Sequence, residues 1–329
     1  MKIDFNDIKL DLNSTKNFGN IQFTPIIMKV KKDTQINKVL YQGLEENKIK
    51  IEELDNASVP EVELVNESDE FYLGYKGTII RGGGQNRQLL HSVVVPGKTS
   101  IKIPVQCIQY GRWNPNKEKK FSSKSTDLTS TSLRFKKQTQ AQTWDTITHR
   151  TTTSRTSTQT QDYTVMHDFF VGDEEDATGA TAFMNAHDQQ DTNKTKVRDR
   201  IQEITNELKT LPNQVGLFIN SIEDEKGEIK EVDYLELFSS SKVYENINRS
   251  IVSSFALDAS MVDTKKIEPN ITQRFEKFIK KLEQMDWEKQ NSIGKETREE
   301  IIENPEKMFG ERIFNEDELV HLMCSSKLI

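Results

Sequence analysis

The stretch LLHSVVVPGKTSIKIPVQC, at residues 89–107, predicts two strands joined by a tight turn. Its first half, Leu89 to Val95, is rich in β-branched residues and ends at the turn-forming dipeptide Pro96-Gly97. In its second half, apolar side chains or a thiol occupy every other position: Ile101, Ile103, Val105 and Cys107. Alternate residues of a strand point to the same face, so this period of two places Cys107 among core side chains. We therefore expect a β-hairpin whose two outer ends lie side by side.

Both outer ends of this hairpin carry polar motifs. Three consecutive glycines lie between Arg81 and Arg87 before the first strand, and Gly111-Arg112-Trp113 follows the second. Glycine allows positive φ and close approach of the backbone to a ligand. Successive backbone N–H groups can form an anion-binding concavity, and the planar guanidinium of arginine suits phosphate or carboxylate. The sequence thus predicts one site for an anionic ligand with a flat part, such as a nucleotide.

Each residue of the predicted site has an expected role. The two arginines before the hairpin and the glycine amides hold phosphate, the two carboxamides contact sugar or base edges, and the tryptophan stacks on a base. The predicted ligand-binding residues are Arg81, Gly82, Gly83, Gly84, Gln85, Asn86, Arg87, Arg112 and Trp113. A flexible turn explains the glycines equally well, and a buried stacked pair explains the last two residues. The run is not a P-loop, because no Lys-Ser/Thr follows it.

Cys107 and the histidines offer weaker signals. The alternating neighbours of Cys107 favour a core thiol, and a nucleophilic role would need Arg87 or Arg112 to lower its pKa. His91 follows Arg87 closely enough to reach the site, but we interpret it as a packed polar residue. The histidines are scattered, and none is paired at i, i+4: His91, His149, His167, His187 and His321. We therefore predict no metal site and no cofactor.

Composition limits the class of protein. The net charge of −7 argues against general nucleic-acid binding, which needs a basic surface. Two distant cysteines argue against a disulfide framework or a zinc site. An acidic start, and the lack of an apolar run near the ~20 residues that cross a bilayer, predict a soluble cytoplasmic protein without membrane contact.

The pattern along the chain predicts an α+β fold. We expect a first domain at residues 1–265, made of a β-rich part (1–121), a polar insertion (122–196) and a helix/hairpin part (197–265). A helical carboxy-terminal appendage is predicted at residues 266–329. Helices are expected at 36–46, 197–211, 241–259, 272–285, 295–308 and from Glu316, and a second hairpin at 215–219 and 229–238.

The ordered motifs of residues 83–87, 103–107 and 111–113 resemble a bacterial family of uncharacterised proteins. This family is named for its association with ADP-ribosylglycohydrolases and rhodanese-type phosphatases. The likeness spans about Phe23 to Ala259 and implies a context in NAD and ADP-ribose metabolism. Two departures, Lys76-Gly77-Thr78 in place of Asp-Gly-Glu and Gln109 in place of glutamate, remove carboxylates and favour binding over hydrolysis.

Three functions follow as alternatives. The first is a binding module for an NAD-derived or ADP-ribose-like nucleotide. The second is an enzyme that hydrolyses such a nucleotide or transfers a group from it, through Cys107 or an activated water. The third is a structural or partner-binding protein that uses its polar and acidic segments as the contact surface. The sequence leaves open a small nucleotide-like ligand and a protein partner.

Overall fold

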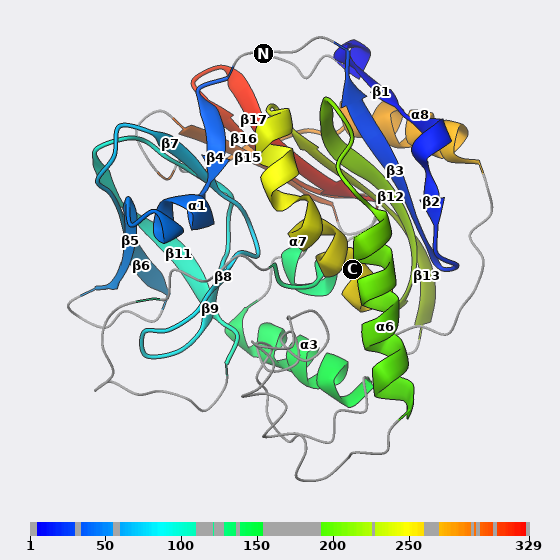
Figure 1. Ribbon diagram of the computed structural model, residues 1–329, viewed down its shortest axis with the longest axis horizontal. Helices are drawn as coiled ribbons and strands as arrows, with labels where there is room; N and C mark the ends of the chain where they lie inside the picture. The colour runs from blue at the N-terminus through cyan, green and yellow to red at the C-terminus, as the bar shows by residue number, and fades with distance from the viewer. Residues whose placement is uncertain are drawn as a thin grey trace.

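The computed structural model of the chain describes residues 5–29, 34–54, 60–109, 121, 128–135, 139–153, 192–225, 228–259, 270–290, 293, 297–304 and 308–326. In this part of the chain, three β-sheets contain nine, three and five strands. Helix α7 (Ser241–Ala259) lies between the large sheet and the two smaller ones (Figure 1). Strands therefore dominate the architecture, and α7 fills the space between the sheets.

The large sheet is antiparallel throughout and has the order β1-β3-β12-β13-β17-β16-β15-β14, with β2 paired to β3. Its strands are β1 (Ile8–Leu10), β2 (Lys16–Asn17), β3 (Ile21–Met28), β12 (Gln214–Glu225), β13 (Glu228–Phe238), β14 (Glu288–Lys289), β15 (Thr297–Asn304), β16 (Met308–Asn315) and β17 (Glu318–Ser325). Strands that follow each other along the chain, such as β12 and β13 or β16 and β17, are also neighbours in the sheet. β17 in addition pairs with β13, which is distant in sequence, and so lies between β13 and β16. The sheet is thus built from segments at both ends of the described chain.

Both faces of the large sheet are covered. Leu217 and Ile219 of β12 pack in the same apolar cluster as Ile251 of α7. The intervening Phe218 packs on the opposite face, where its ring lies 5.6 Å from that of Phe278. Phe278 belongs to α8 (Ile271–Glu283), so α7 and α8 cover opposite faces of one strand with a period of two.

The two smaller sheets carry the segment predicted to form the ligand site. The three-stranded sheet consists of β10 (Val93–Val95), β7 (Phe71–Gly74) and β4 (Ile36–Val39). The five-stranded sheet consists of β5 (Ile49–Glu53), β6 (Glu61–Asn66), β11 (Thr99–Cys107), β9 (Arg87–Leu89) and β8 (Ile79–Ile80). The remaining helices are α1 (Leu40–Glu45), α2 (Thr131–Arg134), α3 (Gln140–Thr153) and α6 (Thr192–Glu207), with short 3-10 turns at Phe5–Asp7 and Leu12–Ser14.

Helix α7 confirms the helix predicted at residues 241–259. Val243, Ile247, Ile251 and Phe255 recur at helical spacing and are at most 2% exposed. Phe255 also contacts the aromatic rings of Phe135 (5.9 Å) and Tyr234 (5.0 Å). This packing explains why the periodic pattern of α7 predicted its bounds correctly.

The α+β prediction is wrong, because the described residues form a mainly β protein. The largest error concerns the helical appendage: beyond α8, the strands β15, β16 and β17 occupy residues 297–304, 308–315 and 318–325, and β17 pairs with β13. Helices had been predicted there at residues 295–308 and from Glu316. Charged residues pair across neighbouring strands instead, as when Arg312 donates to Glu300 through Nε at 2.7 Å. Tertiary pairing therefore overrides the local helical preference.

The predicted hairpin at residues 89–107 also needs correction. The first strand divides at Leu90–Ser92 into β9, which pairs with β11, and β10, which pairs with β7. The pairing that matters for the site is present, because Arg87 lies opposite Cys107. The break between the two short strands brings His91 toward the large sheet.

Of the helices in the described part of the chain, none combines the length and apolar character needed to span a bilayer.

We expect deletion of residues 318–329 to abolish folding, because it removes β17 from the middle of the large sheet. Val320, Leu322, Met323 and Cys324 are at most 2% exposed, and their loss opens β13 and β16. Circular dichroism and thermal melting of the deleted chain measure the effect, with deletion of residues 327–329 as the control. A cooperative melt close to that of the full chain would contradict the prediction.

Candidate functional site

Residues 81–86 form the loop that joins β8 to β9. Ile80 pairs with Arg87 across the base of this loop. Gly82 and Gly83 have φ values of +110° and +56°, a region that favours glycine. A Cβ on Gly83 would lie 2.7 Å from Oε1 of Glu53, so this glycine also allows a close approach. The group that approaches is a carboxylate of the protein itself.

Glu53 lies in an anion cradle formed by the loop and β9. The amide of Gly84 donates to Glu53 Oε1 at 3.1 Å. Nη2 of Arg87 donates to both carboxylate oxygens at 2.8 Å, and the guanidinium lies 5.7 Å from the centre of the Phe121 ring. The glycine amide and the arginine predicted to hold a ligand phosphate therefore hold an internal carboxylate.

The cradle has unused hydrogen-bonding capacity. Arg87 is fully buried, and its Nε and Nη1 groups lack a hydrogen-bond partner among the described residues. Buried N–H donors are nearly always satisfied, because leaving one unpaired costs ~1–3 kcal/mol. Two unsatisfied donors on one guanidinium indicate that Glu53 alone does not complete this environment.

The two carboxamides of the loop are largely buried. Gln85 and Asn86 are each 8% exposed. The side-chain oxygen of Asn86 accepts a hydrogen bond from the backbone N–H of Gly82 at 2.9 Å, and the backbone N–H of Asn86 donates to Gln109 Oε1 at 3.1 Å. Asn86 thus organises the loop, and Gln109, one of the two departures from the family pattern, supports it.

Cys107 ends β11 opposite Arg87 and is 2% exposed. Its thiol donates to the Gln109 carbonyl at 3.1 Å, and its backbone exchanges hydrogen bonds with the Gln140 side chain at 3.0 and 2.7 Å. These contacts are those of a packed core thiol. The loop of residues 81–86 leads into Arg87 of β9, opposite Cys107, whereas Arg112 and Trp113 lie outside the described residues.

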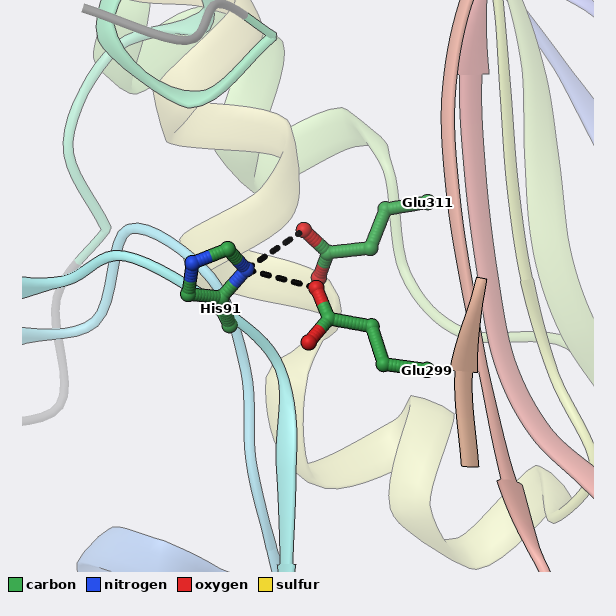
Figure 2. A group of neighbouring side chains, drawn as sticks. All are labelled: His91, Glu299 and Glu311. Atoms are coloured by element: carbon green, nitrogen blue, oxygen red, sulfur yellow. Dashed lines mark hydrogen bonds and ion pairs between the residues drawn. The ribbon is translucent and has the colours of Figure 1, made fainter. Parts of the chain in front are cut away.

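A second polar cluster forms where His91 meets the large sheet. Nδ1 of His91 lies 2.5 Å from Glu299 Oε1 and 3.7 Å from Glu311 Oε2 (Figure 2). Glu311 is also held by Lys76 Nζ at 3.2 Å and by the Ser92 amide at 2.8 Å. The cluster joins the segment after β9 to β15 and β16. Its imidazole and carboxylates are also the groups in the described chain that could hold a metal ion.

Electrostatics keep this cluster ionised. Burial lowers the pKa of His91, but hydrogen bonds to Glu299 and Glu311 outweigh burial and raise it to about 9. Burial raises the pKa of Glu311, but the charge of Lys76 and the hydrogen bond of His91 bring it well below its ordinary value. At neutral pH the cluster therefore contains the His91 imidazolium and the Glu311 carboxylate, with the side chain of Lys76 beside them.

The cluster continues into the protein through Ser92. The Ser92 hydroxyl contacts His321 Nδ1 at 3.1 Å, and His321 Nε2 lies 3.4 Å from Glu236 Oε1. Arg134 pairs with the same oxygen of Glu236, and both residues are fully buried. Burial raises the pKa of Glu236, but the charge of Arg134 outweighs it and the pKa is lowered. Charged groups thus connect α2 with β13, β17 and β16.

The acidic half of this cluster was not predicted from the sequence. Glu299 and Glu311 lie in segments predicted to be helical or left unassigned. A signal was available, because Glu299 and Ile301 are separated by the charged Glu300, and Glu311 and Ile313 by the charged Arg312. A period of two places each glutamate on the core face.

A family model described as the ARG and Rhodanese-Phosphatase-superfamily-associated Protein domain matches residues 9–325. The chain therefore belongs to this family, which its name links to ADP-ribosylglycohydrolases and rhodanese-phosphatase proteins. No curated protein and no solved structure matches the chain.

We expect Gly83→Ala to lower the free energy of unfolding by about 1–3 kcal/mol. The new Cβ would meet Glu53 Oε1 and the Phe121 ring at 2.7 Å, at a φ of +56°. Urea denaturation measures the loss. In a Glu53→Ala background the added cost should be smaller, because one obstructing group is gone. If Gly83→Ala lowers the free energy of unfolding equally in both backgrounds, Gly83 does not make room for Glu53.

The raised pKa of His91 predicts a pH-dependent stability. The pKa of His91 rises from an ordinary value of 6.5 to about 9 in the folded protein. Its contribution to the free energy of unfolding is therefore complete below pH 6.5 and is lost as pH rises through 9. Because the side chain is 33% exposed, we expect a screened effect of about 1–2 kcal/mol.

Denaturant unfolding of wild type and His91→Gln between pH 6 and 10, in a chelator, measures this contribution. The difference in stability between the two proteins should shrink toward high pH. A difference that stays constant across this range would show that the interaction with Glu299 and Glu311 does not depend on the imidazolium.

Proposed function

We propose that this protein binds an anionic, nucleotide-like ligand of the ADP-ribose class at the loop of residues 81–87. The ligand class is suggested by the association in the family's name. One observation carries the location: the buried Arg87 and the Gly84 amide already hold a carboxylate, and two further guanidinium donors have no partner within the described part of the chain.

A phosphate group is suited to this cradle. The guanidinium has a planar set of donors that matches phosphate oxygens, and the neighbouring Gly84 amide donates to the same Glu53 carboxylate. Glu53 is the internal equivalent of that phosphate. A ligand anion placed beside Glu53 would be repelled by it, so binding requires the Glu53 side chain to leave.

The position of Glu53 permits this exchange. β5 is an edge strand of the five-stranded sheet, and Glu53 is its last residue. A movement of this side chain therefore breaks no pairing inside the sheet. The exchange sets a limit on affinity, because the ligand must replace an ion pair that the free protein already makes.

Hydrolysis of the same ligand is the second candidate function. The observation that favours it is the imidazolium of His91, which is one-third exposed and is held by two carboxylates. Such a group is a proton donor at neutral pH, as general acid catalysis needs. Incubation with ADP-ribose or NAD followed by chromatography distinguishes turnover from binding.

Calorimetric titration with ADP-ribose and NAD tests the binding function. We expect Glu53→Gln to bind more tightly than wild type by about fivefold or more, because a neutral amide competes less for Arg87. Arg87→Lys keeps the charge but loses the planar donor set, and should weaken binding by about tenfold, or 1.4 kcal/mol.

Glu52→Gln is the matched control, since Glu52 is exposed one residue away on β5. It should bind as wild type does. Absence of heat with both ligands, in wild type and in Glu53→Gln, would refute the proposal. Tighter binding in Glu52→Gln as well would mean that general charge, and not displacement of Glu53, controls affinity.

A further inference from the structure

The cluster of His91, Glu299 and Glu311 has the composition of a metal site. Its ligand atoms, one from each residue, lie within 4.8 Å of one another. Three separate segments supply them: the turn after β9, strand β15 and strand β16. Glu299 pairs in register with Ile313, two residues from Glu311, so both carboxylates lie on one face of the sheet.

The two carboxylates converge on a single ring nitrogen. Figure 2 shows both directed at Nδ1 of His91, at 2.5 Å from Glu299 and 3.7 Å from Glu311. The Nδ1–H group of His91 donates well to one acceptor only. A hydrogen bond to Glu299 therefore does not explain why the Glu311 carboxylate also faces Nδ1. Convergence of one nitrogen and two oxygens is the arrangement that a metal ion needs.

The two glutamates differ in how many donor groups contact their carboxylates. Lys76 and the Ser92 amide hold Glu311. Glu299 is 5% exposed, and within the described residues His91 is the one basic group that contacts it. Without a positive charge at this point, a buried Glu299 carboxylate next to Glu311 is strongly unfavourable.

A second, independent observation comes from the adjoining network. Glu236 Oε2 and His321 Nε2 are buried without a hydrogen-bond partner in the described part of the chain. Glu236, His321, Glu311 and Glu299 occupy four strands on the same face of the large sheet. The three carboxylates there contact Lys76, Arg134 and His91, so a bound metal ion would take the place of the proton that His91 carries at Nδ1.

The geometry allows an ion to enter. Zinc bonds nitrogen and oxygen ligands at ~2.0–2.2 Å, which places tetrahedral ligands ~3.3–3.6 Å apart. The present separations from His91 are 2.5 and 3.7 Å, so small side-chain shifts suffice. His91 is 33% exposed while the carboxylates are 5% and 1% exposed, and the imidazole therefore marks the side from which the ion arrives.

We propose that His91, Glu299 and Glu311 bind one divalent transition-metal ion of the zinc or manganese class. A mixed set of one imidazole and two carboxylates suits these ions better than Mg²⁺ or Ca²⁺, which prefer oxygen ligands alone. Lys76 and the Ser92 amide fix the orientation of Glu311 outside the ligand set.

Titration of the chelator-treated full chain with Zn²⁺, and separately with Mn²⁺, tests the site. We expect saturable binding of one equivalent by calorimetry, with a matching change in the Mn²⁺ paramagnetic resonance spectrum. Glu299→Gln and His91→Gln should each weaken this binding by at least about tenfold.

Glu300→Gln is the matched control, because Glu300 lies beside Glu299 but pairs with Arg312 and Arg298. It should bind metal as wild type does. If circular dichroism shows that Glu299→Gln is unfolded, His91→Gln decides, because His91 lies in a turn and is partly exposed. The proposal is overturned if neither ion binds saturably, or if His91→Gln binds with wild-type affinity. ADP-ribose binding can succeed or fail independently, since it depends on Arg87 and Glu53.

Discussion

The ion pair between Glu236 and Arg134 determines how the parts of this protein dock. Both side chains are fully buried, and a buried charge costs several kcal/mol unless it is paired. Arg134 also donates to the Lys76 carbonyl at 3.3 Å and to the Ser254 hydroxyl at 3.2 Å. One guanidinium therefore joins β13 of the large sheet, helix α7 and the segment leading to β8. The placement of Lys76 beside Glu311 follows from this contact.

Both candidate sites are built around ions that belong to the protein. At the glycine loop a guanidinium holds Glu53, and at the large sheet an imidazolium holds Glu299. Such internal partners keep a site in one geometry before any ligand arrives, which reduces the ordering cost of binding. They also compete with the ligand. Occupancy of the loop therefore depends on how readily Glu53 moves away, and occupancy of the metal site on how readily His91 gives up its proton at Nδ1.

The sequence predicted the elements whose pattern is local. The period of α7 and the alternation in β11 depend on neighbours a few residues apart, and both are present. The need for glycine at residue 83 was also predictable. The role of Arg87 was not, because its partner Glu53 is 34 residues away and a sequence does not show which carboxylate a buried arginine meets.

The missed cluster has the same cause on a larger scale. Lys76 and Glu311 are separated by 235 residues, and His91 and Glu299 by 208. Their encounter depends on the docking of separate sheets. The segment of β15 was predicted to be a helix and most of β16 was left unassigned, since the strand pairing that neutralises their charges is not visible along the chain. Local pattern therefore predicted strands and turns near the loop, and failed where the partners are distant.

The central place of β17 has a consequence for how the protein is made. β17 pairs with β13, yet α7, α8, β14, β15 and β16 are synthesised between them. While the ribosome produces those elements, β13 displays unpaired backbone groups that attract other chains. Completion of the sheet is thus a late, long-range event, and slow assembly of this kind makes the nascent chain a natural client for chaperones.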